Sequence, residues 1–225
     1  MEYLLDTADK KAIEQVLSYY PIDGITTNPT IISKESGAYL DILKNLDTLL
    51  DGRQFHIQLT SETFEDMIKE ANLLKKVIQS DLYLKIPVSD HGIKAIYKLS
   101  KAGYKITATA VTSLNQGIMA AKAGAEYLAF YVNRTSLTGI DGNTVINDIN
   151  AIFERDGYQT KIIGASYKST YQINESILKG CDSVTVSPEL FDNLVNTETT
   201  SNSIEQFTQH FTERFGQVGP SIYKE

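Results

Sequence analysis

The sequence predicts an α/β fold: a single (β/α)8 barrel with an additional C-terminal helix. Short apolar or β-branched segments alternate along the chain with stretches of helical periodicity. Eight such strand–helix units fit into the 225 residues, which suits a compact TIM barrel. A doubly wound open sheet is the structural rival. It would more often use five or six strands and a Gly-rich first turn, and neither feature is present.

Each expected strand is a short apolar or β-branched run. The strands begin near residues 3, 24, 55, 82, 105, 127, 161 and 183. Their sequences are YLLDT, GITTN, FHIQLT, LYLKIPV, KITATAV, YLAFYVN, KIIGASY and SVTVSP. After the third strand, Ser61 precedes ETFEDMIKEANLLKKVI, where acidic residues come early and lysines late, as the helix dipole favours. We expect residues 1–200 to form one barrel domain.

Residues 201–225 are expected to form a C-terminal helix and tail. One face of this helix carries large apolar side chains at i, i+4 and i+8, with one more a turn earlier: Phe207, Phe211, Phe215 and Ile204. Gly216 is suited to end the helix. The apolar stripe needs a partner surface, and the sequence leaves open whether that is the chain's own barrel or a neighbouring subunit. The tail after Gly216 is expected to be peripheral.

Composition excludes several classes of function. The net charge is −7 and no Lys/Arg block is present, which argues against a nucleic-acid or membrane-surface partner. The three histidines, His56, His91 and His210, are far apart and Cys181 is the one cysteine, so no zinc-type spacing occurs. No Gly-rich phosphate loop is present. We therefore expect no metal and no cofactor.

The cellular setting is inferred from the cysteine and the N-terminus. With only Cys181, no intramolecular disulfide can form, which suits a reducing compartment, and we expect a buried core thiol. The start, MEYLLDTADKK, resembles neither a signal peptide nor a transit peptide. No apolar stretch approaches the roughly 20 residues that cross a bilayer. We expect a soluble, cytoplasmic protein.

Hydrogen-bonding side chains stand at or near the C-terminal ends of the first seven expected strands. In strand order they are Asp6; Thr26 and Asn28; Gln58; Lys85; Thr109; Tyr131 and Arg134; Ser166 and Lys168. Strand parity places Thr26 with Asn28, and Tyr131 with Asn133, on shared faces. Barrel enzymes carry their chemistry at this end of the strands, and packing alone hardly explains such a convergence. Histidine 56 shares the face of Gln58 but lies nearer the strand's start. We interpret it as an interior or subunit-contact residue.

Lys85 interrupts the apolar run LYLKIPV. A single lysine in a strand is commonly a snorkelling edge residue or half of a buried ion pair. In a barrel it would instead be enclosed, and desolvation lowers the pKa of an amine by up to about 3–5 units. A neutral amine beside a ketone forms a Schiff base, and the protonated imine withdraws electrons from a nearby carbon–carbon bond.

Two segments resemble the signatures of the transaldolase family: DGITTNPTII, Asp23 to Ile32, and LYLKIPVS, Leu82 to Ser89. The resemblance continues through ATAV, AFYVNR and GASYKS, over essentially the whole chain. The short chain is similar to the small-subunit branch, which includes fructose-6-phosphate aldolases. It implies a barrel with the Schiff-base lysine on the fourth strand, where Lys85 falls.

The resemblance also implies roles for the other polar side chains. Substrate hydroxyls would be bound by Asp6 and Asn28, with support from Thr26. A water or hydroxyl that moves the proton would be held by Gln58, Thr109 and Tyr131. The terminal phosphate would be bound by Arg134 and Ser166 with Lys168, where the guanidinium suits bidentate contact.

Two positions indicate which member of the family this is. True transaldolases usually carry glutamate on the third strand and phenylalanine on the sixth, where this chain has Gln58 and Tyr131. That pair favours an aldolase that forms or cleaves fructose 6-phosphate from dihydroxyacetone and glyceraldehyde 3-phosphate. The alternatives are a transaldolase of the pentose phosphate pathway and a silent sugar-phosphate-binding ring. Family members form rings, commonly a decamer of two pentamers in which the C-terminal helix reaches a neighbour.

Overall fold

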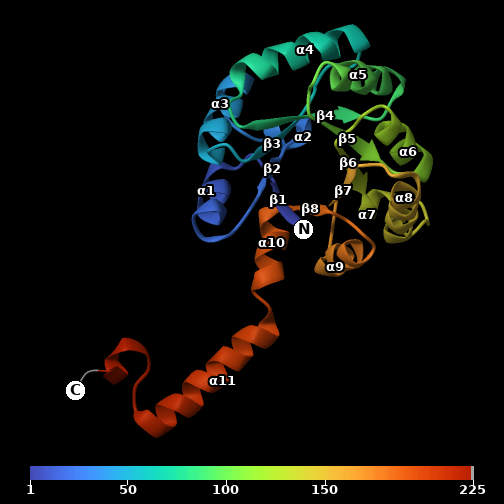
Figure 1. The fold of residues 1–225 in the computed structure, drawn as a ribbon. Coiled ribbons are helices and arrows are strands. Elements are labelled where there is room, and N and C mark those ends of the chain that lie inside the picture. Colours follow the sequence, from blue (N-terminus) through green and yellow to red (C-terminus); the bar gives the residue numbers. More distant parts are fainter. Residues whose placement is uncertain (224–225) are drawn as a thin grey trace. The chain divides into compact units, whose positions relative to one another are not determined.

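In the computed structural model, which describes residues 1–223, eight parallel strands close into a barrel (Figure 1). Every strand pairs with its sequence neighbours, and β1 pairs with β8 to close the sheet. The strands are β1 (Glu2–Asp6), β2 (Gly24–Thr26), β3 (Gln54–Gln58), β4 (Asp81–Pro87), β5 (Ile106–Val111), β6 (Tyr127–Tyr131), β7 (Lys161–Ala165) and β8 (Ser183–Val186). The predicted (β/α)8 fold is confirmed.

Helices follow every strand. Those up to the last strand are α1 (Lys10–Tyr19), α2 (Pro29–Ile32), α3 (Tyr39–Leu50), α4 (Phe64–Val77), α5 (Asp90–Lys101), α6 (Leu114–Lys122), α7 (Val132–Ser136), α8 (Gly142–Asp156) and α9 (Thr170–Leu178). The long ones surround the barrel (Figure 1). Two helices each follow β2 and β6, and the short first helix in both places, α2 and α7, continues directly from the mouth of the barrel.

Side-chain caps explain where the covering helices begin. The caps share an oxygen that accepts a hydrogen bond from a backbone N–H of the first turn: Asp9, Thr63, Ser89, Ser113, Asp141 and Ser169. Each such cap contributes about 1 kcal/mol and fixes the residue at which the loop ends. Except for Asp141, which ends the loop between α7 and α8, these caps end loops that leave the C-terminal ends of strands, so they also fix the rim of the mouth.

Inward side chains form layers taken from alternate strands, as expected of this barrel. The parallel registers place Thr26, Lys85, Ala129 and Thr185, from the even-numbered strands, in one layer. The layer beneath comes from the odd-numbered strands: Leu4, His56, Thr107 and Ile163. Each member of this lower layer is fully buried. The barrel is therefore filled below Lys85.

His56 is the polar centre of the lower layer, which agrees with the predicted interior position. Its Nδ1 lies 2.7 Å from Thr107 Oγ1 and its Nε2 lies 3.0 Å from Gln54 Oε1. Its ring stacks on Tyr83 with centroids 4.5 Å apart. Burial holds the His56 pKa well below its usual value, and the nearby charge of Lys85 lowers it further. The imidazole is thus neutral in the folded protein.

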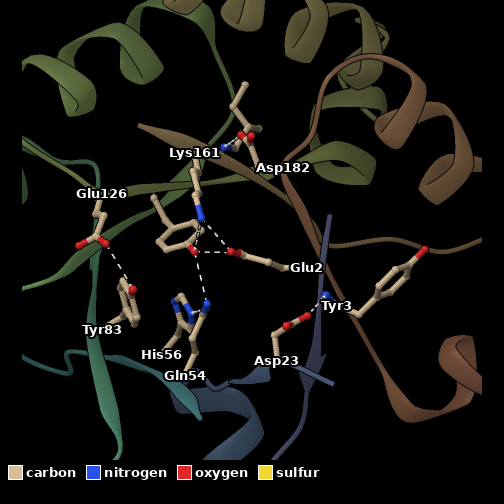
Figure 2. A network of polar contacts seen from close by, with 11 residues as sticks. Glu2, Tyr3, Asp23, Gln54, His56, Tyr83, Glu126, Lys161 and Asp182 are labelled. Carbon is tan, nitrogen blue, oxygen red and sulfur yellow. Dashed lines mark hydrogen bonds and ion pairs between the residues drawn. The ribbon is translucent and has the colours of Figure 1, made fainter. Parts of the chain in front are cut away.

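The contacts of His56 continue toward the start of the strands (Figure 2). Gln54 Nε2 donates to the Tyr127 hydroxyl at 3.4 Å, and that hydroxyl donates to Glu2 at 2.8 Å. Lys161 in turn forms an ion pair with Glu2 at 2.8 Å. Since Gln54 presents its amide NH2 to Tyr127, its oxygen accepts the His56 Nε2–H. Nδ1 of the neutral ring therefore accepts a hydrogen bond from the Thr107 hydroxyl.

The chain divides into two compact units, Met1–Pro188 and Glu189–Glu225. The second contains most of α10 (Pro188–Val195), then α11 (Glu198–Phe215) and a 3-10 turn over Gly219–Tyr223. Gly216 ends α11 in the left-handed conformation with φ 76°, as predicted.

The predicted apolar face lies on α11, where the Phe211 and Phe215 rings are 4.7 Å apart. Docking of this face on a neighbouring subunit stays a prediction. The last two residues of the expected peripheral tail, Lys224 and Glu225, lie outside the described residues.

Within residues 1–223, no helix is both long and apolar enough to span a bilayer. The same residues contain no group of three or more His, Cys, Asp or Glu side chains placed to bind a metal ion. Cys181 is buried, as expected, and burial raises the pKa of its thiol to about 12. The thiol is therefore protonated and unreactive at neutral pH.

Neutral burial of His56 predicts acid sensitivity. The unfolded chain binds a proton at this residue near pH 6.5, while the folded chain does so only at lower pH, so the free energy of unfolding falls as the pH drops below about 6.5. In His56→Phe, chemical denaturation between pH 7 and pH 4.5 is expected to show a smaller loss, by up to about 1.4 kcal/mol per pH unit. The exposed His210→Gln is the control and should keep the wild-type slope. Equal slopes in His56→Phe and wild type would contradict a neutral His56.

Candidate active site

Lys85 points into the closed barrel, two residues before the end of β4, and only 4% of it is exposed. Its neighbours in the strand, Leu84 and Ile86, are also fully buried, so both faces of β4 are shielded from water at this point. No salt bridge to Lys85 occurs among the described residues; the opposite charge that acts on its pKa is that of Asp6. The amine is thus enclosed without a contacting counter-ion, and the snorkelling interpretation does not apply.

Two opposing effects act on the Lys85 amine. Burial disfavours the ammonium and is the larger effect, while the Asp6 carboxylate attracts the positive charge; together they leave the pKa below its usual value. A lowered pKa increases the share of neutral amine at physiological pH. Neutral amine is the form that attacks a carbonyl carbon.

Asp6 and Thr26 form a hydrogen-bonded pair beside Lys85. Thr26 donates to Asp6 Oδ1 at 2.6 Å and lies 2.7 Å from Thr185 Oγ1. Because Thr26 gives its only proton to Asp6, Thr185 must donate to Thr26. The Asp6 carboxylate is half-buried at the end of β1. The hydrogen bond from Thr26 holds one of its oxygens in place, and the other can accept a hydrogen bond from a ligand.

A second group lies above the lysine layer. Gln58 ends β3 in register with Lys85 and is half-buried. Thr109 is fully buried on β5 and donates to the Tyr131 hydroxyl across 3.4 Å. The next residue, Ala110, has φ 58° at a break in the β5–β6 register, so β5 bulges where Thr109 meets the mouth. A bulge of this kind re-aims a side chain.

Asn28 has a structural task at the mouth. It lies just after β2, where it caps α2 by accepting the Ile31 N–H at 3.0 Å. Its side-chain oxygen is therefore occupied, and its NH2 group is the part that can donate to a ligand. A cavity of about 150 Å³ opens here and is lined by both Asn28 and Gln58. The prediction that Thr26 and Asn28 share a strand face assumed that both lie in the strand, but β2 ends at Thr26 and Asn28 lies beyond it.

The predicted phosphate ligands lie around the ends of β6 and β7. Arg134 is exposed on α7, and its guanidinium carbon lies 4.6 Å from the centre of the Tyr131 ring. Ser166 follows β7 in the left-handed conformation with φ 62°. A non-glycine residue in that region is uncommon and turns the chain sharply at the rim. Lys168 is exposed two residues later.

Two details differ from the expectation for these strand ends. Asn133 does not share a strand face with Tyr131, because β6 stops at Tyr131 and α7 begins at Val132. Its side-chain oxygen accepts from Gln172 at 3.1 Å instead. The eighth strand, for which no polar mouth residue was expected, supplies Thr185. Its inward position in the alternating segment SVTVSP was the signal that could have revealed it.

The fold and the enclosed amine place the chain among the (β/α)8-barrel enzymes. A family model described as transaldolase/fructose-6-phosphate aldolase matches residues 3–220. A relative from Streptococcus pneumoniae (strain ATCC 700669 / Spain 23F-1), named probable fructose-6-phosphate aldolase, is 33% identical over 210 residues, covering 92% of this chain and 95% of the relative. The chain therefore belongs to the transaldolase/fructose-6-phosphate aldolase family, and it is an enzyme of the Schiff-base aldolase and transaldolase class.

Burying the Lys85 amine should cost the fold stability. Since its pKa is lowered on folding, the unfolded chain holds the proton more tightly, and the loss is largest at neutral pH and shrinks as the pH rises toward the ordinary lysine pKa. We expect Lys85→Met to raise the free energy of unfolding at pH 7 by about 1–2 kcal/mol, and by less at pH 9. Urea denaturation measures both. The exposed Lys94→Met should change stability by less than about 0.5 kcal/mol. A destabilised Lys85→Met would contradict the account.

Removing the Asp6 charge should favour neutral Lys85. In Asp6→Asn the attraction that holds the ammonium is lost while burial remains, so the Lys85 pKa is expected to fall further. The pH dependence of Lys85 acylation by a small reagent, followed by peptide mass spectrometry, should shift to lower pH. Asp41→Asn, an exposed carboxylate on α3, is the control. An unchanged or upward shift would show that Asp6 does not act on the amine.

Proposed function

We propose that this enzyme is a class I aldolase that reversibly cleaves fructose 6-phosphate into dihydroxyacetone and glyceraldehyde 3-phosphate, with Lys85 as the nucleophile. The observation that carries the proposal is the enclosed amine of Lys85, whose pKa burial lowers. The family supports the reaction class, and the name of the pneumococcal relative supports the aldolase within it.

The reaction follows from the chemistry of an amine and a ketose. Neutral Lys85 Nζ adds to carbon 2 of the open-chain sugar, and loss of water with uptake of one proton from solvent gives a protonated imine; that proton is returned when the imine is hydrolysed. Removal of the proton from the carbon 4 hydroxyl then breaks the bond between carbons 3 and 4. The bond's electrons flow into the imine as an enamine, and glyceraldehyde 3-phosphate leaves. Protonation of the enamine at carbon 3 and hydrolysis of the imine release dihydroxyacetone and restore the amine.

Proton transfer falls to the group above Lys85. The Tyr131 phenol can give and take a proton, while Gln58 and Thr109 have no acidic proton to offer near neutral pH. The hydrogen bond from Thr109 to the Tyr131 hydroxyl supports this division, because it leaves the phenolic proton free to point toward a substrate hydroxyl or a water. Gln58, in register with Lys85, would hold that water.

Substrate binding is divided between the two sides of the mouth. Asp6, held by Thr26, and the NH2 group of Asn28 would bind the hydroxyls of the dihydroxyacetone part. The phosphate at the far end would be bound by Arg134, Ser166 and Lys168. An Arg guanidinium forms paired hydrogen bonds with phosphate oxygens, and a Lys ammonium acts as a point charge.

Gln58 and Tyr131 favour a free aldolase over a transferase. A glutamate at the third-strand position could hold and return a proton, which an amide cannot do, and Tyr131 adds an acid on the opposite side. In this chain the proton donor would therefore be Tyr131 on the sixth strand rather than a glutamate on the third. An acid on the sixth strand fits an enzyme that protonates the enamine and releases dihydroxyacetone. A transferase must instead keep the enamine until an aldose phosphate arrives.

Two measurements test the function. Wild type with fructose 6-phosphate alone should release glyceraldehyde 3-phosphate, and borohydride added with dihydroxyacetone should increase the mass of the peptide that contains Lys85. We expect Lys85→Met to lose both signals, a fall in rate of at least about 10⁴-fold, while Lys94→Met keeps them. Cleavage only when erythrose 4-phosphate is present would identify a transaldolase. Sugar-phosphate binding without any turnover or labelling would contradict both enzymes.

A further inference from the structure

Gln172 connects two segments at the mouth of the barrel. It lies in the first turn of α9 and is half-buried. Its Oε1 accepts the backbone N–H of Lys168 at 2.8 Å, and its Nε2 donates to Asn133 Oδ1 at 3.1 Å. One amide thus holds the loop after β7 on one side and helix α7 on the other. The contacts span 39 residues of sequence between Asn133 and Gln172.

The orientation of this amide is fixed by its partners. A backbone N–H can only donate, so the atom of Gln172 that faces Lys168 must be the oxygen. The NH2 group then faces Asn133, whose carbonyl oxygen is the acceptor. Reversal of the amide would set two donors against each other at Lys168. The link therefore has one favourable geometry.

The backbone of Gln172 is anchored on its other side. Its N–H donates to Ser169 Oγ at 3.3 Å, and its carbonyl accepts from Ser176 Oγ at 2.9 Å and Asn143 Nδ2 at 3.5 Å. Ser176 is fully buried and Asn143 nearly so, and their side chains contact each other. The side chain of Gln172 consequently extends from a fixed base that includes α8 and α9.

Both partners of Gln172 adjoin the proposed phosphate ligands. Asn133 is the residue before Arg134, and the loop that Gln172 holds at Lys168 begins with Ser166. The Asn133 N–H also donates to the Ser166 carbonyl at 3.3 Å, and this long bond is the one direct hydrogen bond between α7 and the Ser166–Lys168 loop among the described contacts. Gln172 itself has no hydrogen bond to the side chains of Arg134, Ser166 or Lys168 among the described contacts.

We propose that Gln172 is a positioning residue that sets the separation between Arg134 on α7 and the Ser166–Lys168 loop, and thereby the fit of the site to a phosphate group. The inference rests on the proposed function, in which these residues bind the substrate phosphate. Without the bridge, one long backbone hydrogen bond remains between α7 and the loop among the described contacts, so the three ligands are held less precisely around a single anion.

The test compares a phosphorylated with an unphosphorylated acceptor. Dihydroxyacetone is combined with glyceraldehyde 3-phosphate or with glyceraldehyde, in wild type and in Gln172→Leu. We expect kcat/KM for the phosphorylated aldehyde to fall about tenfold, mainly through KM, and that for glyceraldehyde to change less than about twofold. Equal losses with both aldehydes, or none with either, would overturn the proposal.

Gln116 provides a matched control. It occupies the same place in α6, three residues after the capping Ser113, and its Oε1 accepts from the Thr112 N–H at 3.0 Å. Its side chain contacts only its own loop, through Thr112 and Ser113, among the described hydrogen bonds. Gln116→Leu therefore removes a similar loop contact but no link between two segments. It should leave unchanged the ratio of kcat/KM for glyceraldehyde 3-phosphate to kcat/KM for glyceraldehyde.

A second variant and a binding readout keep the test decisive. Asn133→Ala removes the same bridge from α7, so it should reproduce the change, and the Gln172→Leu/Asn133→Ala double variant should add little. Binding of inorganic phosphate, followed by phosphorus NMR, should weaken about tenfold in both single variants. Should wild type bind phosphate without turnover, the proposed function fails, and the weaker phosphate binding of the variants still supports the role of Gln172. Unchanged phosphate binding in both variants would overturn it.

Discussion

Desolvation of a single amine is the constraint on which the rest of the structure depends. Lys85 is nearly fully buried because the barrel is closed and its interior beneath the lysine is filled. An open sheet would leave an edge through which water could reach the ammonium. Closure therefore does more than complete the backbone hydrogen bonding, since it removes the solvent that would otherwise stabilise the ammonium form of Lys85.

The filling beneath Lys85 is polar, which needs a physical reason. His56 and Thr107 lie on the strands that flank β4, and the hydrogen bond between them lies one layer below the amine. Both His56 nitrogens are paired, so the polar layer leaves no unsatisfied imidazole group there. The charges of Glu2 and Lys161 are kept at the opposite end of the barrel, where they form an ion pair with each other. A neutral layer thus separates the amine from those charges.

Local patterns in the sequence predicted the strands, the fold and the enclosure of Lys85, because alternation and burial within one segment are local properties. Prediction failed where the chain leaves the sheet. The parity assigned to Asn133 does not hold, since α7 begins at Val132 directly after β6. Thr185 and Gln172 were missed because their importance arises from partners far away in sequence, Thr26 and Asn133. Such pairs are fixed by barrel register and by helix packing, which a single sequence does not display.

The two halves of the candidate site are built from different kinds of structure. Lys85 and Thr109 project from strands inside the barrel, whose pairing on both sides fixes them. The proposed phosphate-binding half stands on a five-residue helix, α7, and on a loop that begins at Ser166, whose backbone is left-handed. A short helix and a strained turn have few hydrogen bonds of their own to hold them. If a phosphate binds there as proposed, its rigid placement depends on side chains from neighbouring elements. Within residues 1–223, Gln172 is the side chain that hydrogen-bonds to both α7 and the loop.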